Sequence, residues 1–191
     1  DAPPSFFAAL QSTLSLFSRY SQKRTVLSEC AHLFGRIFLS NRTFFLEFAQ
    51  KTGSNTIPLL LKALIDHGYR APFLSRLRVG IYFLAGMLQL GAPAAIENAV
   101  QVVNAIGEML RTLQKKESSS RVYTEPYDEV TYKSALWNIR KQLVESDTLS
   151  TPQVEKFVID SLMACRNQRP GFDSIYAQIK PKNAEVLNAI T

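Results

Sequence analysis

Residues 73–91 read Phe73-Leu-Ser-Arg-Leu-Arg-Val-Gly-Ile-Tyr-Phe-Leu-Ala-Gly-Met-Leu-Gln-Leu-Gly91, and this stretch decides the fold. Its side chains are apolar almost all round from Val79 to Leu90, a pattern typical of a helix that is buried on every side. The apolar run is shorter than the roughly 20 residues that a membrane span needs. Gly80 and Gly86 each cost a helix about 1 kcal/mol relative to alanine, so we expect them to permit the close approach of a neighbouring helix.

A second helix is predicted directly after the first. Gly91 is suited to ending a helix, and Pro93 is suited to starting the next one, where its missing N–H group does no harm. From there to Lys116 the apolar side chains recur every three or four residues and lie on one stripe: Ile96, Ala99, Val100, Val103, Ile106, Leu110 and Leu113. The two helices are therefore expected to form a helical hairpin.

The remaining chain repeats this pattern and contains no convincing strand. Similar apolar stripes predict helices around residues 5–20, 26–38, 44–53, 58–68, 132–143, 152–165, 172–179 and 181–190. The sequence therefore predicts an all-α fold of antiparallel helical hairpins stacked as a HEAT/armadillo-like α-solenoid, with hairpin units of roughly 40 residues. A closed helical bundle is the alternative.

The composition changes after the predicted hairpin. Residues 117–131 are rich in serine and acidic side chains and show no apolar period, so we expect an acidic, serine-rich loop insert there. This insert separates helical repeat pairs in residues 1–116 from C-terminal helices of the same solenoid in residues 132–191. Residues 1–116 carry 13 Lys and Arg against 6 Asp and Glu, a surplus suited either to acidic partners or to an ordinary solvated surface.

The side chains that carry chemistry are few and scattered. His32 and His67 have no Cys, Asp or second His at ligand spacing, so the sequence contains no recognisable zinc motif. It contains neither a glycine-rich phosphate loop nor a nucleophile elbow. Cys30 and Cys165 each fall on the apolar face of a predicted helix, so we expect reduced, buried thiols. These features predict a non-enzymatic protein with no cofactor, no metal and no membrane insertion.

Three stretches, taken in order, carry a family resemblance. Residues 27–46 run from an aliphatic helix through a polar corner into aromatic residues, and residues 73–90 combine a charged start with an apolar centre. Asp128-Glu-Val-Thr-Tyr132 and Gly171-Phe-Asp-Ser-Ile-Tyr176 give an acidic insert and then a Gly-Phe corner before the last helix. This order resembles the C-terminal segment of importin-β (karyopherin-β) family nuclear transport receptors, nearest to the importin-eleven branch.

The resemblance implies a segment of a longer receptor that binds protein cargo in the nucleus and the cytoplasm. A small nuclear GTPase and nucleoporins would bind through the receptor's N-terminal part, outside this sequence. Because the second helix of each pair usually lines the concave face of such a solenoid, we expect contacts on the polar side of residues 94–116 and, second, on the insert. The predicted contact residues are Asn98, Gln101, Asn104, Glu108, Tyr123 and Tyr127. A HEAT-repeat scaffold in another complex and a basic helical-repeat module that binds nucleic acid are the alternative functions.

Overall fold

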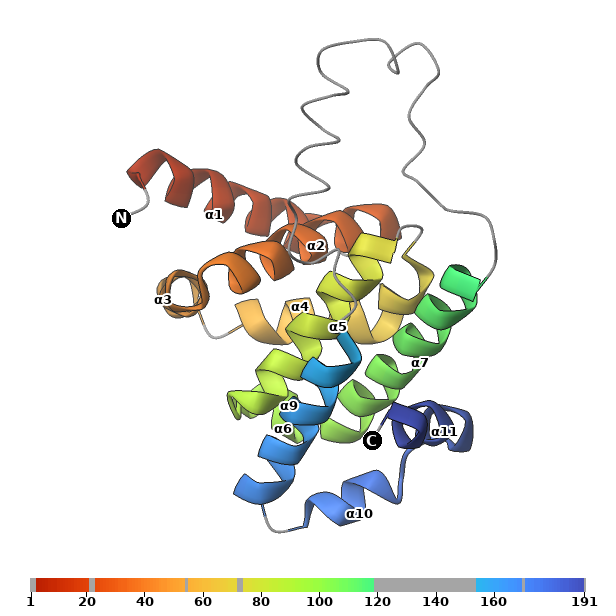
Figure 1. The fold of residues 1–191 in the computed structure, drawn as a ribbon. Helices are drawn as coiled ribbons and strands as arrows, with labels where there is room; N and C mark the ends of the chain where they lie inside the picture. The colour runs from red at the N-terminus through yellow and green to blue at the C-terminus, as the bar shows by residue number, and fades with distance from the viewer. Residues whose placement is uncertain are drawn as a thin grey trace, which may run out of the picture.

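The structure is a computed structural model that describes residues 3–20, 23–53, 55–71, 74–118, 154–169 and 171–190. These residues form helices and their connections, with no strand among them, so the predicted all-α fold is confirmed (Figure 1). The helices of residues 3–118 are α1 (Pro4–Arg19), α2 (Arg24–Ser40), α3 (Arg42–Thr52), α4 (Thr56–His67), the 3-10 turn η1 (Gly68–Arg70), α5 (Leu74–Gln89), α6 (Pro93–Glu97) and α7 (Ala99–Ser118). Those of the C-terminal part are α9 (Val154–Gln168), α10 (Phe172–Tyr176) and α11 (Pro181–Ile190).

Aromatic side chains join the first three helices to the centre of the molecule. Helix α2 runs back beside α1 as an antiparallel hairpin (Figure 1), and Asn41 then caps α3 by accepting a hydrogen bond from the Phe44 N–H group at 3.0 Å. The rings of Phe38 and Phe45 meet edge to face at 5.6 Å, and both rings contact Phe83 of α5. Such aromatic pairs stabilise a core beyond the area that they bury. The N-terminal hairpin is therefore fixed to α5.

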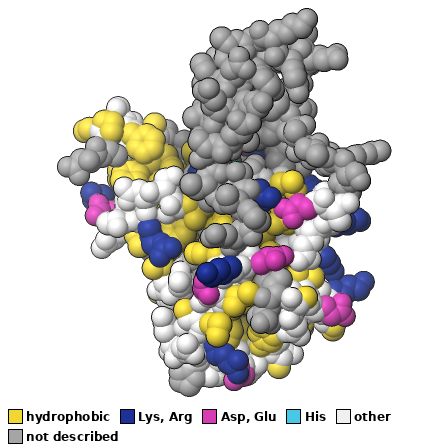
Figure 2. Space-filling view, in the orientation of Figure 1, with side chains coloured by type: hydrophobic (Ala, Val, Ile, Leu, Met, Phe, Trp, Pro, Cys, Tyr) yellow, Lys and Arg dark blue, Asp and Glu magenta, His cyan; other side chains and the backbone are white. Residues whose placement is uncertain are grey.

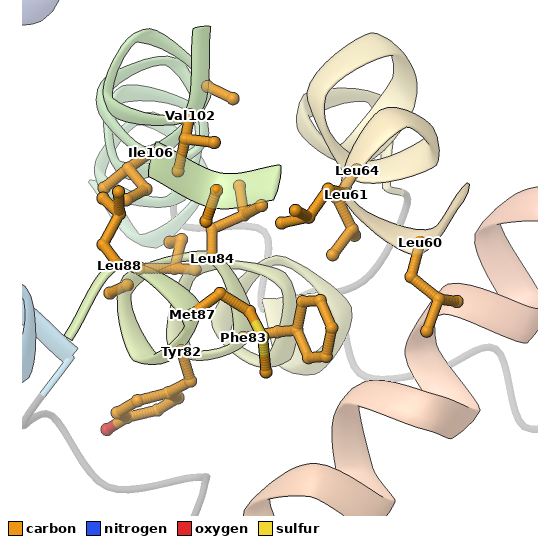
Figure 3. Close-up of a cluster of buried hydrophobic side chains, with 14 of the residues drawn as sticks. Leu60, Leu61, Leu64, Tyr82, Phe83, Leu84, Met87, Leu88, Val102 and Ile106 are labelled. Carbon is orange, nitrogen blue, oxygen red and sulfur yellow. The ribbon is translucent and has the colours of Figure 1, made fainter. Parts of the chain in front are cut away.

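Helix α5 lies at the centre of the fold and is surrounded by α2, α7 and α9. All of its residues from Val79 to Leu88 are buried, as the sequence predicts. Figure 3 shows Leu84 and Leu88 of α5 pointing toward Val102 and Ile106 of α7. Tyr82 points away from that cluster, and its ring meets Phe157 of α9 at 4.9 Å. The stretch that the sequence singles out is thus the core of the molecule.

The two glycines of α5 allow neighbouring side chains to come close, as predicted. A Cβ atom at Gly86 would lie 2.7 Å from the Phe38 ring, which is closer than real Cβ contacts come. A Cβ atom at Gly80 would lie 3.2 Å from the sulfur of Met109 and 3.3 Å from Leu64. The packing of α2 against α5 therefore requires a residue without a side chain at position 86.

The second helix of the central hairpin is divided, which the sequence did not predict. Helix α6 ends at Glu97 and α7 begins at Ala99, with Asn98 between them at a φ of −108°. The Asn98 amide donates a hydrogen bond to the Ala94 carbonyl at 2.8 Å. Asparagine side chains compete in this way for backbone groups, and they are consequently weak formers of helix interiors. The predicted single helix from Pro93 is wrong at this residue.

The C-terminal helices pack back onto the central hairpin. Helix α9 lies along α5, and α11 lies against α7. Helix α7 extends to Ser118, two residues beyond the predicted boundary at 116, and residues 119–153 lie outside the described residues. The predicted insert at 117–131 and the predicted helix at 132–143 therefore stay predictions, apart from the helical residues 117 and 118. The same holds for the division into 1–116 and 132–191.

Candidate functional site

The predicted contact face lies on the α6–α7 side of the central hairpin. Asn98 and Gln101 are exposed there, one at the junction of the two helices and the other in the first turn of α7. The carbonyl of Asn98 accepts a hydrogen bond from the backbone N–H of Val102 at 2.9 Å, which starts the bonding of α7 directly after the break. Two of the predicted residues are therefore exposed to solvent at the start of α7.

Asn104 has a different role, because its amide is engaged within the chain. Its Oδ1 atom accepts hydrogen bonds from the backbone N–H of Lys180 at 2.8 Å and from the Asn183 amide at 3.2 Å. The Asn183 amide also donates to the Asn104 carbonyl at 3.0 Å, and the Asn183 side chain is buried. Asn104 thus fixes the start of α11 on α7, in the middle of the predicted contact face.

A glycine on α7 completes this contact. A Cβ atom at Gly107 would lie 2.7 Å from the Cβ of Asn183 and 3.2 Å from its Cα and carbonyl oxygen. The first turn of α11 therefore rests directly on the backbone of α7. We call the set Asn104, Gly107, Lys180 and Asn183 the α7–α11 clasp. The apolar pattern of the sequence singles out neither Gly107 nor Asn183, because the clasp depends on hydrogen bonds and close approach.

The last predicted residue of the α7 face is partly exposed. A carboxylate oxygen of Glu108 lies 3.8 Å from a guanidinium nitrogen of Arg111, three residues later on α7, and the Glu108 side chain is 31 % exposed. An ion pair on a helix surface contributes little to stability, so both side chains can respond to a partner. Tyr123 and Tyr127, the predicted second contact site, lie outside the described residues.

The basic residues at the start of α5 form ion pairs within the molecule. Arg76 pairs with Glu29 of α2, and Arg78 pairs with Glu117 of α7 at 2.7 Å. The ammonium group of Lys116 donates a hydrogen bond to the Ala71 carbonyl at 2.8 Å, and burial lowers the pKa of this lysine. The ion pairs of Arg76 and Arg78 connect α5 to α2 and α7, so each guanidinium group already has a partner within the molecule.

The two histidine side chains are half-buried, and the two cysteine side chains are buried. His32 and His67 line one small cavity between α2 and α4, and the Nδ1 atom of His67 is buried without a hydrogen-bond partner. The thiols of Cys30 and Cys165 are buried and unpaired, as predicted, and burial raises the pKa of each. Within the described ranges, no three or more His, Cys, Asp or Glu residues are grouped so that they could hold a metal ion.

The structure has two surface grooves that contain none of the predicted contact residues. One, of about 540 Å³, lies where α1, α2 and α3 meet, and Phe6, Ile37, Phe44 and Glu47 are among its lining residues. The other, of about 410 Å³, lies between α9, α10 and α11, beside the Met163 side chain. The sequence did not indicate the first groove, because the periodicity of Phe6 and Phe44 assigned both residues to the core. In the part of the chain that the structure describes, no helix is long and apolar enough to cross a membrane.

Comparison with known proteins gives one match. The model of the family described as Importin-11-like, TPR repeats, matches residues 5–191. Neither the curated proteins nor the solved structures gave a significant match. TPR repeats, like HEAT and armadillo repeats, are helical units that stack into a solenoid, so the match agrees with the helix order of Figure 1 and supports the predicted architecture.

Proposed function

Because the chain belongs to the importin-11-like family with TPR repeats, we propose that it is a non-enzymatic protein-interaction segment of a nuclear transport receptor. The receptor carries protein cargo through nuclear pores and moves between the nucleus and the cytoplasm. The small nuclear GTPase and nucleoporins bind to other parts of the receptor. The observation that carries this proposal is the family match, which extends over nearly the whole described chain and agrees with its helical-repeat fold.

The contact surface on the α6–α7 side is part of the same proposal. Asn98 and Gln101 are exposed, and Glu108 is partly exposed, so these three can meet a partner directly. Asn104 is half-buried and holds the start of α11 on α7, because its Oδ1 atom accepts hydrogen bonds from Lys180 and Asn183. Tyr123 and Tyr127 remain predicted as a second contact. Polar residues around an ordered helix suit a cargo that is held by hydrogen bonds over a shallow surface.

The deciding experiment is capture of cargo by the full-length receptor, with and without the GTP-bound nuclear GTPase. We expect proteins to be retained without the GTPase and released when its GTP form is added, but not when its GDP form is added. Changing Asn98 and Gln101 together to lysine should weaken cargo retention. Gln50→Lys on α3 is the matched control, because Gln50 is also an exposed polar residue on a helix.

Two outcomes would contradict the proposal. Retained proteins that ignore the nucleotide state of the GTPase would indicate a scaffold in another complex. A retained fraction dominated by RNA that is lost in moderate salt would indicate nucleic-acid binding, because phosphate contacts weaken steeply as salt rises. The ion pairs of Arg76 and Arg78 argue against this second outcome.

A further inference from the structure

A small polar cavity lies where α2, α4 and the start of α5 meet, in the interior of the repeat array that Figure 2 shows from outside. His32 of α2, His67 at the end of α4 and Arg76 of α5 supply its polar lining. The rest of the lining is short or apolar: Ala31, Ala63, Leu64, Gly68 and Ala71. None of these residues belongs to α1 or α11, so the cavity is formed by helices that have neighbours on both sides along the chain.

The cavity contains a polar atom that the surrounding side chains leave unsatisfied. The Nδ1 atom of His67 is buried, and it has no hydrogen-bond partner among the described residues. A buried nitrogen without a hydrogen bond is costly, and buried polar groups in folded proteins almost always have a partner, either a protein group or an ordered water molecule. The His67 ring therefore requires a partner that its protein neighbours do not supply.

The end of α4 holds the His67 ring against the cavity. Gly68 follows directly, and its N–H group donates a hydrogen bond to the Leu64 carbonyl. A Cβ atom at Gly68 would lie 2.8 Å from the sulfur of Met109, so the chain passes close to α7 at this point. The backbone beside His67 is thus packed against a second helix, and its ring lines the cavity from the last residue of α4.

The size of the cavity limits what it can hold. Its volume is about 10 Å³, counted as the space open to the centre of a water molecule. That volume is about the least that holds one water molecule. A phosphate group, a carboxylate or a larger organic group would not fit, so the occupant is no larger than a single water molecule.

The charges around the cavity favour a neutral occupant. Arg76 repels a cation, and its positive charge is already balanced by the ion pair with Glu29, so an anion gains little there. His32 and His67 also fall short of the ligands that a metal ion needs, because in the part of the chain that the structure describes no further His, Cys, Asp or Glu forms a group of three with them. A neutral molecule therefore suits the cavity better than an ion of either sign.

We infer that this cavity is the site of one internal water molecule, which is hydrogen-bonded to the Nδ1 atom of His67. Water suits this atom in either tautomer of the ring, because water both donates and accepts hydrogen bonds. His32 and Arg76 line the same space and offer further polar contacts, and internal water molecules typically make about three. The water joins α4 to α2 and α5. This inference goes beyond the proposed function and does not depend on it.

The test is a double-mutant cycle of Ala31→Val and His67→Leu, measured as thermal unfolding midpoints of the full chain. Ala31 is 2 % exposed and lines the cavity, so valine would occupy the space of the water. Ala31→Val alone should lower the midpoint by about 2–4 °C or more, because His67 loses its hydrogen-bond partner. With His67→Leu already in place, Ala31→Val should cost much less, because no buried ring nitrogen is left unsatisfied.

The cycle can overturn the inference in two ways. If Ala31→Val alone leaves the midpoint unchanged or raises it, the cavity is dry, because filling a dry cavity stabilises a protein. If Ala31→Val lowers the midpoint equally with His67 and with His67→Leu, the cost comes from overpacking and not from a lost water. Circular dichroism of each variant should match the unmodified chain, and His67→Met replaces His67→Leu if it does not.

A high-resolution crystal structure of the unmodified full chain tests the inference without any substitution. We expect density for one water molecule at about 2.7–3.2 Å from the Nδ1 atom of His67. A cavity without density, or one with anomalous scattering from a metal ion, would overturn the inference.

Discussion

Replacing Gly107 with alanine tests how α11 is held on α7. The new Cβ atom would lie 2.7 Å from the Cβ of Asn183 and 3.2 Å from its backbone. Because the first turn of α11 rests there, relief of the clash requires α11 to move as a unit. Such a movement lengthens the hydrogen bonds that Asn104 accepts from Lys180 and Asn183.

The expected cost of Gly107→Ala follows from three opposing contributions. Alanine favours the interior of α7 by about 1 kcal/mol relative to glycine. Overpacking against a backbone costs about 1–3 kcal/mol, and a buried amide left without its partners costs a further 1–3 kcal/mol or so. If α11 moves away, the overpacking is relieved but the hydrogen bonds to Asn104 are lost. The chain therefore does not incur both costs in full. The net destabilisation should therefore be about 1–3 kcal/mol, in the direction opposite to helix propensity.

The assay combines urea unfolding with amide hydrogen exchange. We expect α11 to lose protection in Gly107→Ala before α5 does, because the clasp is local and α5 is buried on every side. Asn104→Ala removes the hydrogen bonds that the Asn104 side chain accepts, and it introduces no clash. The double variant should be destabilised by less than the sum of the two single variants. Gln101→Ala is the control on the same helix, since Gln101 is exposed.

One result would refute this reasoning. If Gly107→Ala raises the midpoint of unfolding, the gain in helix propensity is unopposed and α11 does not rest on Gly107. Full additivity with Asn104→Ala would likewise separate the glycine from the hydrogen bonds, and the clasp would not be one structural unit.

Three further predictions follow from the core. Gly86→Leu should destabilise the chain by about 1–3 kcal/mol or more in thermal melts, because the new side chain would clash with the Phe38 ring. Unchanged or raised stability would contradict the close approach of Phe38 to Gly86. The thiols of Cys30 and Cys165 should react with a disulfide reagent near neutral pH only as fast as the chain opens, because both are buried and their pKa values are raised; rapid reaction in the folded state would contradict this. Burial also raises the pKa of Tyr82, and Arg78 opposes this with a smaller effect. The folded state therefore keeps the phenolic proton to a higher pH than the unfolded state, so the free energy of unfolding should fall as the pH rises above 10. The absorbance of tyrosinate at alkaline pH and the unfolding midpoint should both show this change, and Tyr82→Phe should reduce the alkaline loss; an equal loss in Tyr82→Phe would assign the effect to other groups.

The fold could be predicted because its main signals are local. The continuous apolar run of α5 and the cap at Asn41 are readable within one or two helical turns, and the structure has both. Gly86 could be assigned to close packing because glycine destabilises the interior of a helix, so its presence there indicates that a neighbouring group needs the space. The break at Asn98 was not predicted because the apolar stripe continues on both sides of it. The feature that accompanies the break is the hydrogen bond from the Asn98 amide to the Ala94 carbonyl, which the stripe does not indicate.

The candidate site was harder to predict because its contacts join distant parts of the chain. Asn104 carries the polar character of a solvent-facing residue, yet its partner Asn183 is 79 residues away and turns it into a support for α11. Nothing in the periodicity of α7 indicates that pairing. Helix α1 shows the opposite error, since the apolar spacing of Phe6 was attributed to the core, although its side chain is 42 % exposed.

The position of α9 along α5 has a consequence for synthesis of the chain. Tyr82 of α5 meets Phe157 of α9, so α9 covers one side of the central helix with residues that leave the ribosome much later. At ordinary elongation rates the delay between the two residues is about 4–15 s. During that time the nascent chain displays an uncovered apolar side of α5, a ready binding site for chaperones. Pausing of the ribosome before α9 should therefore increase chaperone association more than pausing after it.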